Sequence, residues 1–95
     1  MKFLENFNFS KEDIDEFINN TPKDIAEAIK DNKELVESNI DYLKGLGTNA
    51  YIEIFIDYPD MFFLDHSTFK DIFEKYETDS LIEKLNKNHK IVEYL

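Results

Sequence analysis

Residues 39–64 read NIDYLKGLGTNAYIEIFIDYPDMFFL, and this stretch decides which fold the chain can adopt. It is the most apolar run in the sequence and contains both glycines. Its central part, residues 51–58, fits two kinds of secondary structure. Alternating isoleucines favour a strand, whereas Tyr51, Phe55 and Tyr58 fall on one face of a helix. Because no other segment has a strand pattern and a lone strand lacks a hydrogen-bonding partner, we predict a buried helix here.

Capping signals on both sides of this stretch divide the chain into short helices. Ser10, followed three residues later by Asp13, is a variant of the capping box, in which each side chain bonds the other residue's backbone N–H. Thr21-Pro22 is a second start signal, because Thr can cap a helix and Pro suits the first helical position. Further helix starts are expected at Thr48, at Asp65 or Ser67, and at Thr78.

Apolar residues recur between these signals at the three- and four-residue spacing of amphipathic helices. The helix that precedes the central stretch is expected to end at Gly45 or Gly47 in a left-handed conformation. The clearest apolar stripes are Ile14, Phe17 and Ile18; Leu35, Val36, Ile40 and Leu43; and Phe69, Ile72, Phe73 and Tyr76. We therefore predict an all-α domain of five to seven short helices.

The sequence also matches itself at two offsets. A shift of 37 residues places Pro22 on Pro59, and a shift of 30 places Phe55 on Leu85, with His89 where the middle segment has proline. This spacing is typical of helical repeats, in which stacked neighbours bury stripes that one unit cannot bury alone. Alternatively, any helical protein with capped turns matches itself at some offset. We predict one domain over residues 1–95, with two or three stacked helical-repeat units at about 3–32, 35–64 and 67–95.

The middle unit contains, in order, a leucine–glycine turn, a short helix, a proline and an apolar pair. The residues are Leu43-x-x-Leu46-Gly47, Tyr51-Ile52, Phe55, Tyr58-Pro59 and Phe62-Phe63-Leu64. This order resembles the repeat of the mitochondrial transcription termination factor (mTERF) family. The resemblance implies a curved stack of short helices that binds nucleic acid through a basic concave surface.

The charge of the chain predicts a different kind of partner. There are 21 acidic residues against 11 basic ones, and all the basic residues are lysines. Nucleic-acid binders concentrate cations, and Arg makes the bidentate contacts to guanine and phosphate. We therefore expect a small acidic interaction module that binds a protein with a basic surface, as an inhibitor, an immunity-type factor or a nucleic-acid mimic. The expected partner-binding residues are Glu12, Asp13, Asp15, Glu16, Asp57 and Asp60.

Two alternatives stay open. Nucleic-acid binding, as the resemblance implies, requires the lysines to gather on one face while the acids lie elsewhere. The candidate lysines are Lys23, Lys30, Lys33, Lys84, Lys87 and Lys90. An obligate homo-oligomer, whose partner is a second copy of the chain, is the other alternative.

No residue cluster indicates an enzyme, a cofactor or a metal site. Asp65-His66 lacks the two or three further ligands that a metal site needs. Carboxylate pairs such as Glu12/Glu16 fall on exposed helix faces, not in an apolar cleft that would shift their pKa. There is no Cys and no glycine-rich phosphate loop. We expect no enzymatic activity, no cofactor and no bound metal.

Composition also bears on location and on the core. The first residues, MKFLENFNF, lack the uninterrupted apolar core of a signal peptide, and no run reaches the roughly 20 apolar residues of a membrane span. We therefore expect a cytoplasmic protein. Most of the 14 aromatic residues are expected in the core. The alternative for the phenylalanines at positions 3, 7, 9, 62 and 63 is a partly exposed patch that contacts a partner.

Overall fold

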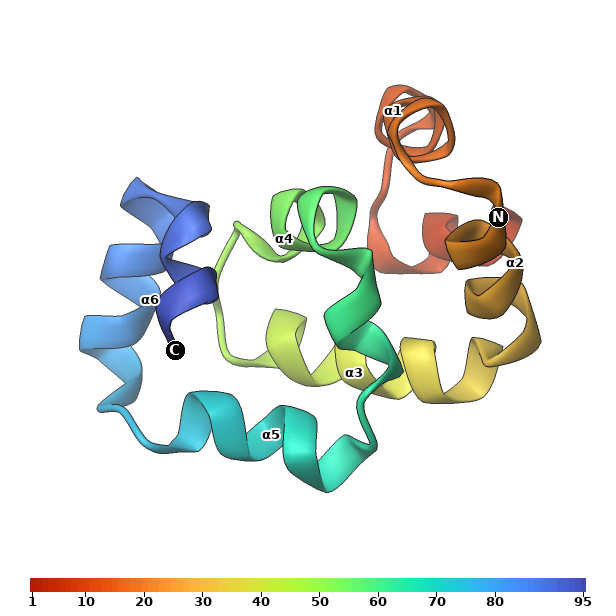
Figure 1. Ribbon diagram of the computed structural model, residues 1–95. Coiled ribbons are helices and arrows are strands. Elements are labelled where there is room, and N and C mark those ends of the chain that lie inside the picture. The colour runs from red at the N-terminus through yellow and green to blue at the C-terminus, as the bar shows by residue number, and fades with distance from the viewer.

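The computed structural model describes residues 1–95, and every regular element in it is helical (Figure 1). There are six α-helices and three 3-10 helices, η1 to η3. Their bounds are η1 Lys2–Phe7, α1 Lys11–Asn20, α2 Lys23–Asp31, α3 Lys33–Gly45, α4 Tyr51–Asp57, η2 Pro59–Phe63, α5 His66–Glu74, α6 Thr78–Lys87 and η3 His89–Tyr94. The all-α prediction is confirmed, and the isoleucine-rich centre of the chain is the helix α4.

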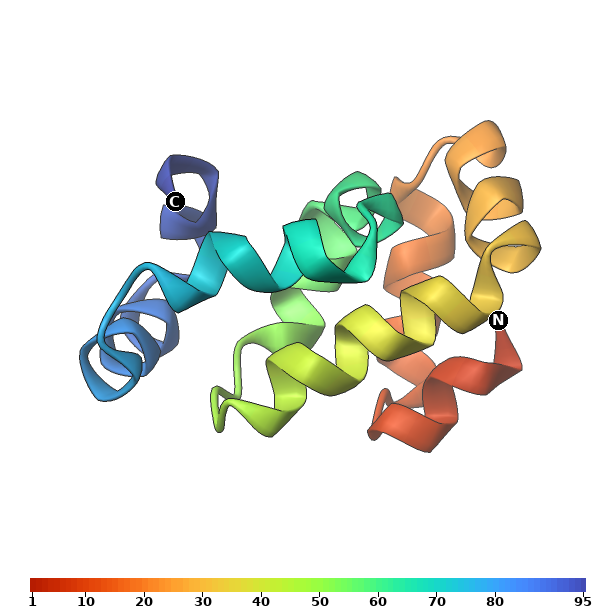
Figure 2. The same ribbon diagram turned by 90° about the horizontal axis from the view of Figure 1, so that it is seen from below.

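The helices follow one another from one end of the molecule to the other. Figures 1 and 2 place η1, α1 and α2 at one end, α3 and α4 in the middle, and α6 and η3 at the opposite end. The domain measures 34 × 26 × 23 Å. The order α-helix, α-helix, 3-10 helix occurs twice, as α3–α4–η2 and as α5–α6–η3. The two 3-10 helices start at Pro59 and His89, which are separated by the 30-residue offset found in the sequence.

Local side-chain caps explain where several helices begin. At α1 the Ser10 hydroxyl accepts a hydrogen bond from the Asp13 N–H (3.0 Å), and the Asp13 carboxylate accepts one from the Ser10 N–H (2.9 Å). This confirms the predicted capping box. Asp65 caps α5, which confirms the first of the two predicted positions, and Glu77 caps α6 by accepting from the Ser80 N–H (2.6 Å).

Two of the predicted helix starts work in another way. The helix α2 begins at Lys23 with Pro22 at the N-cap, and the Thr21 hydroxyl is buried without a hydrogen-bond partner, so the prediction that Thr21 caps it is wrong. Thr48 does not cap α4 itself. Its hydroxyl accepts from the Ala50 N–H (3.1 Å) and donates to Oδ1 of Asn86 (2.7 Å), which ties the α3–α4 loop to α6.

The two glycines differ in conformation although they are two residues apart. Gly47 has φ +104°, whereas Gly45 is the last residue of α3 and has open space around an added Cβ. We expect Gly47→Ala to lower the free energy of unfolding by about 1–2 kcal/mol, because an L side chain is strained at positive φ. Gly45→Ala should raise it by up to about 1 kcal/mol. Urea denaturation followed by circular dichroism measures both, and a change of the same sign in both variants would contradict this assignment.

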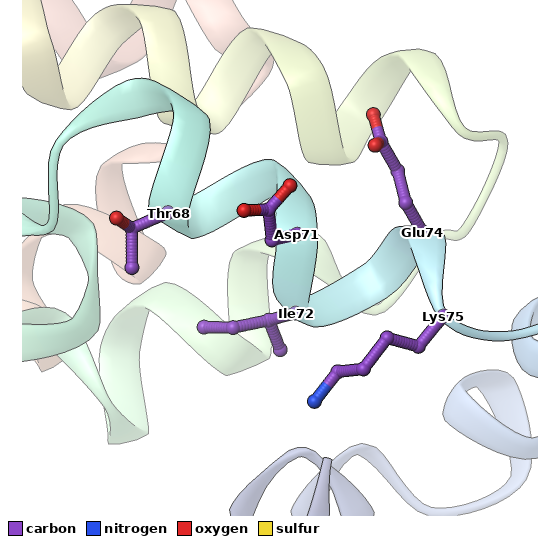
Figure 3. Close-up of a pocket in the computed structure, with 5 residues that line it drawn as sticks. All are labelled: Thr68, Asp71, Ile72, Glu74 and Lys75. Carbon is purple, nitrogen blue, oxygen red and sulfur yellow. The ribbon is translucent and has the colours of Figure 1, made fainter.

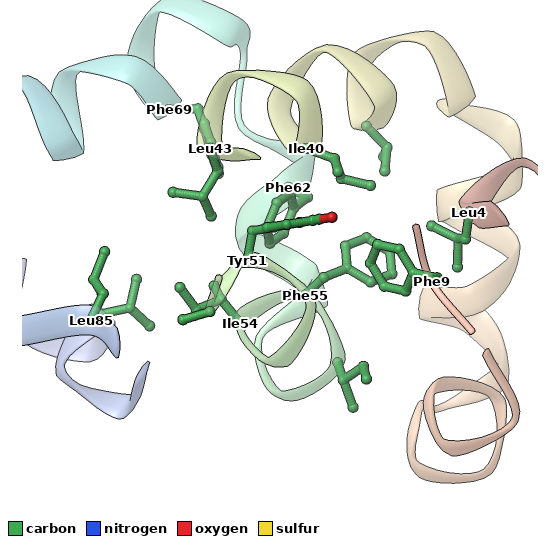
Figure 4. Close-up of a cluster of buried hydrophobic side chains, with 14 of the residues drawn as sticks. Leu4, Phe9, Ile40, Leu43, Tyr51, Ile54, Phe55, Phe62, Phe69 and Leu85 are labelled. Atoms are coloured by element: carbon green, nitrogen blue, oxygen red, sulfur yellow. The ribbon is translucent and has the colours of Figure 1, made fainter. Parts of the chain in front are cut away.

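The core is built around Phe55 of α4, which is completely buried (Figure 4). Its ring centroid lies 5.5 Å from that of Phe9, 4.9 Å from Phe17 and 5.1 Å from Phe62. Phe62 in turn lies 5.0 Å from Phe69 of α5. The aromatic contacts thus run from the N-terminal helices to α5, so segments far apart in the sequence depend on one another for burial.

Some predicted core positions lie at the surface. Ile18 is 50% exposed and Tyr76 is 39% exposed, so the stripes predicted through them are wrong at these positions. The reason at Ile18 is that α1 lies at the edge of the domain and fully buries only Phe17. The aromatic residues for which a partly exposed patch was the alternative divide into two kinds: positions 9 and 62 are buried, whereas positions 3, 7 and 63 are half-buried and pack against the core.

Candidate interaction surface

Most of the acidic side chains form no ion pair with another side chain of the protein. Of the 21 acidic residues, only Glu83 pairs with a lysine, and only Glu53 and Asp57 lie within ion-pair distance of a histidine, His89. Lys87, which lies 3.2 Å from Glu83, is the only lysine paired with a carboxylate. Unpaired charges on an exposed surface sum to a field that extends over a Debye length, about 8 Å at physiological salt. The surface is therefore a source of negative potential and not a network of internal salt bridges.

Four of the six predicted partner-binding residues lie on α1. Glu12, Asp15 and Glu16 are exposed and form no hydrogen bond or ion pair within the chain. Asp13 differs, because its carboxylate accepts the Ser10 N–H and stabilises the start of the helix. Three carboxylates of α1 are thus free to contact another molecule, and the fourth has a structural role.

The way α1 packs sets which side chains point outward. Phe17 anchors the helix against Phe55 of α4, and at 100° per residue Glu12, Asp15 and Asn19 fall opposite Phe17. Ile18 lies at the edge of this outer face and is half exposed. We call the outer side of α1, made by Lys11, Glu12, Asp15, Glu16, Ile18 and Asn19, the α1 face. It combines three carboxylates with one lysine and one exposed apolar side chain, so its net charge is negative.

The other two predicted residues, Asp57 and Asp60, lie beside η3 and not beside α1. Oδ2 of Asp57 is 2.6 Å from Nε2 of His89, and Oε2 of Glu53 is 3.1 Å from Nδ1 of the same ring. Carboxylates only accept hydrogen bonds, so Nε2 of His89 is the donor in the hydrogen bond to Asp57. Asp57 is therefore engaged within the chain, whereas Asp60 is exposed on η2.

Sequence reasoning missed the role of His89. Its only local signal was the four-residue spacing of Glu53 and Asp57, which places two carboxylates on one side of α4. The imidazole reaches them from η3, more than 30 residues further along the chain. The six predicted residues thus form two groups, one on α1 and one beside η3, and Figures 1 and 2 place these elements at opposite ends of the domain.

The candidate lysines also fall into two groups. Lys23, Lys30 and Lys33 lie on α2 and at the start of α3, whereas Lys84, Lys87 and Lys90 lie on α6 and η3. These elements are at opposite ends of the molecule (Figures 1 and 2). Acidic residues lie among the lysines: Asp31 and Glu34 line the same open hollow as Lys30 and Lys33. The six lysines do not form one continuous cluster.

Asp65 and His66 have structural roles at the start of α5. Nδ1 of His66 lies 2.9 Å from Oδ1 of the buried Asn39. The Asp65 carboxylate accepts hydrogen bonds from the hydroxyl (2.6 Å) and the N–H (3.2 Å) of Thr68. These bonds hold the pKa of Asp65 below its usual value, because they favour the charged form.

We expect Asp65→Asn to reduce stability at pH 7 and to change its dependence on pH. A depressed pKa in the folded state contributes stability that is present above the unfolded-state pKa, about 3.9, and is lost as the pH falls through the lower folded-state value. The difference in free energy of unfolding between wild type and variant should therefore become smaller below about pH 4. Urea denaturation at several pH values measures this difference. Asp41→Asn, at an exposed position, is the control, and a gap of constant size in this range would contradict the prediction.

No group of three histidine, aspartate or glutamate side chains is arranged to hold a metal ion. None of the helices combines the length and the apolar character needed to cross a bilayer. The fold and surface together define a small all-α domain with a largely unpaired acidic surface. Comparisons with known protein families, with curated proteins and with solved structures find no match.

Proposed function

We propose that this protein is a non-enzymatic interaction module whose α1 face binds a partner protein with a basic surface. The observation that carries the proposal is the set of carboxylates at Glu12, Asp15 and Glu16, which have no partner within the chain. Free carboxylates on a protein of net charge −10 speed the encounter with a cationic protein and disfavour anionic ones. The exposed Ile18 supplies apolar contact area beside them.

The packing of α1 also supports this role. The helix is fixed by Phe17 and by the Ser10–Asp13 capping box, neither of which uses the outer carboxylates. Its outer side chains therefore contribute little to folding and can serve binding without loss of stability. An inhibitor, an immunity-type factor or a nucleic-acid mimic would each use such a surface. We place this activity in the cytoplasm, where a chain without cysteine is at no disadvantage.

A charge-reversal comparison tests the proposal. Wild type and the variant Glu12→Lys/Asp15→Lys/Glu16→Lys are each immobilised. Proteins that bind them from a cell extract at about 50 mM salt are identified. The identified proteins are then purified, and their affinities are measured by titration. The matched control, Asp24→Lys/Glu27→Lys/Asp31→Lys, carries the same charge change on α2, where all three residues are exposed. At about 0.2–1 kcal/mol for each surface ion pair, the α1 variant should lose about tenfold or more in affinity for a basic protein that the control still binds. Recovery of no basic protein, or equal binding by both variants, would refute the α1 face.

Nucleic-acid binding by an mTERF-like repeat protein is the alternative. It is supported by the twofold occurrence of α-helix, α-helix and 3-10 helix at a 30-residue offset. It is opposed by the separation of the lysines into two groups with acids among them. A gel shift with random-sequence RNA and DNA at about 50 mM salt decides, because contacts to the phosphate backbone are strongest at low salt. A shifted band at micromolar protein would favour this alternative over an acidic module.

A further inference from the structure

A second surface feature lies between η2, α5 and η3, far from the α1 face. It is a hollow of about 310 Å³, at the lower end of the roughly 300–1,000 Å³ range of ligand pockets. We call it the η2–η3 groove. Its apolar lining consists of Tyr58, Met61, Ile72, Val92 and Leu95. A hollow of this size and character fits one large apolar side chain and is too small for a packed helix.

The edge of the η2–η3 groove is acidic. Asp60 of η2 and Glu93 of η3 complete the lining, are exposed and form no ion pair, and no lysine belongs to the lining. Burial and then the Glu93 carboxylate raise the pKa of Tyr58, so its phenol stays protonated at neutral pH beside a negative charge. The groove therefore offers an apolar floor with two unneutralised carboxylates at its edge.

One lysine of α5 lies close to the groove. Figure 3 shows Ile72 and Lys75 projecting to one side of α5, and Asp71 and Glu74 to the other. Nζ of Lys75 lies 3.4 Å from the carbonyl oxygen of the groove residue Leu95, so one cation stands next to the groove. Lys75 is not part of the lining and pairs with neither Asp60 nor Glu93, so both groove carboxylates stay unpaired. Ile72 also lines a second, open hollow on α5, whose lining residues are drawn as sticks in Figure 3.

We propose that the η2–η3 groove binds a segment of a partner protein in which one apolar side chain stands beside a lysine or an arginine. The apolar side chain buries against Met61, Ile72 and Val92, and the cation lies between Asp60 and Glu93. A nucleic acid, or a second copy of this chain at net charge −10, would instead bring negative charge to the same carboxylates. The inference rests on the proposed preference for basic partners and adds a site with an apolar requirement.

Nuclear magnetic resonance titration of the isotope-labelled chain, residues 1–95, tests the groove. The probes are three capped hexapeptides: alternating arginine and leucine, alternating arginine and alanine, and alternating glutamate and leucine. The variants are Asp60→Lys/Glu93→Lys and, in case charge reversal disturbs the fold, the neutral Asp60→Asn/Glu93→Gln. The control Asp24→Lys/Glu27→Lys makes the same charge change on α2.

We expect the arginine–leucine peptide to bind most tightly and to shift the methyl signals of Met61, Ile72 and Val92. The charge reversal Asp60→Lys/Glu93→Lys should weaken the binding of this peptide by about tenfold. The neutral variant Asp60→Asn/Glu93→Gln should weaken it by a smaller factor, and the α2 control should weaken it by no more than about twofold. If the arginine–leucine and arginine–alanine peptides bind equally and shift signals over the whole surface, the groove is not a binding site. That result would leave the proposed acidic interaction module unaffected. Failure of every arginine peptide to bind at low salt would overturn both.

Discussion

Phe55→Ala is expected to lower the free energy of unfolding by about 3–5 kcal/mol, a large share of the roughly 5–15 kcal/mol typical of a small domain. Phe55 is fully buried, and its ring contacts those of Phe9, Phe17 and Phe62. Removing the ring deletes buried apolar area and leaves a cavity at the point where α1, α4 and η2 meet. Urea denaturation followed by circular dichroism measures the loss.

Two comparisons show whether that loss comes from the central position of Phe55. Phe55→Leu keeps an apolar side chain and should cost less than alanine. Ile18→Ala removes an apolar side chain that is half exposed and should change stability by no more than about 0.5 kcal/mol. A loss below about 1.5 kcal/mol in Phe55→Ala would mean that the helices do not depend on one common aromatic core.

The second large effect is expected at Asn39, a fully buried polar residue of α3. Its Nδ2 donates to the carbonyl oxygens of Phe62 (3.0 Å) and Leu64 (2.9 Å), and its Oδ1 lies 2.9 Å from Nδ1 of His66. Since an amide oxygen only accepts, the His66 ring carries its proton on Nδ1 at this contact. One side chain thus bonds the segment that leads from η2 into α5.

We expect Asn39→Leu to lower the free energy of unfolding by about 2–4 kcal/mol, because it leaves the carbonyl groups of Phe62 and Leu64 without a donor. Asn39→Asp, which keeps the size but cannot donate when ionised, should cost at least as much at pH 7. Asn19→Ala, at an exposed position on α1, should stay within about 0.5 kcal/mol. Urea denaturation of the three variants measures the differences. A nearly neutral Asn39→Leu would show that these hydrogen bonds do not hold η2 and α5 in place.

The features that sequence reasoning found are those that depend on neighbours within one helical turn. The Ser10–Asp13 capping box, the Asp65 cap and the positive φ of Gly47 each involve residues at most three apart. The helix α4 was also predicted, because a strand needs a partner that the rest of the chain does not offer. Ile18 was misplaced because periodicity shows which residues share a face, but not how wide a stripe the neighbouring helix covers.

The candidate surfaces were only partly accessible from sequence. Glu12, Asp15 and Glu16 share the outer side of α1 as their spacing suggests, whereas Asp13 caps the helix, and Asp60 was named without the groove beside it. The His89 contacts to Glu53 and Asp57, the Asn39 bonds to η2 and the Thr48–Asn86 bond were not predicted. Each of these joins residues more than 20 positions apart, and no local pattern specifies them.

The sequence by itself determined the helical class, the ends of most helices and the large excess of negative charge. These follow from local hydrogen bonding, from hydrophobic period and from composition, which act without knowledge of the packed state. Only the tertiary structure decided which carboxylates stay free, which polar groups meet inside, and that η2, α5 and η3 enclose an apolar groove with Asp60 and Glu93 at its edge. The physical reason is that these depend on the angles at which helices pack, and those angles are set by the whole core around Phe55 at once.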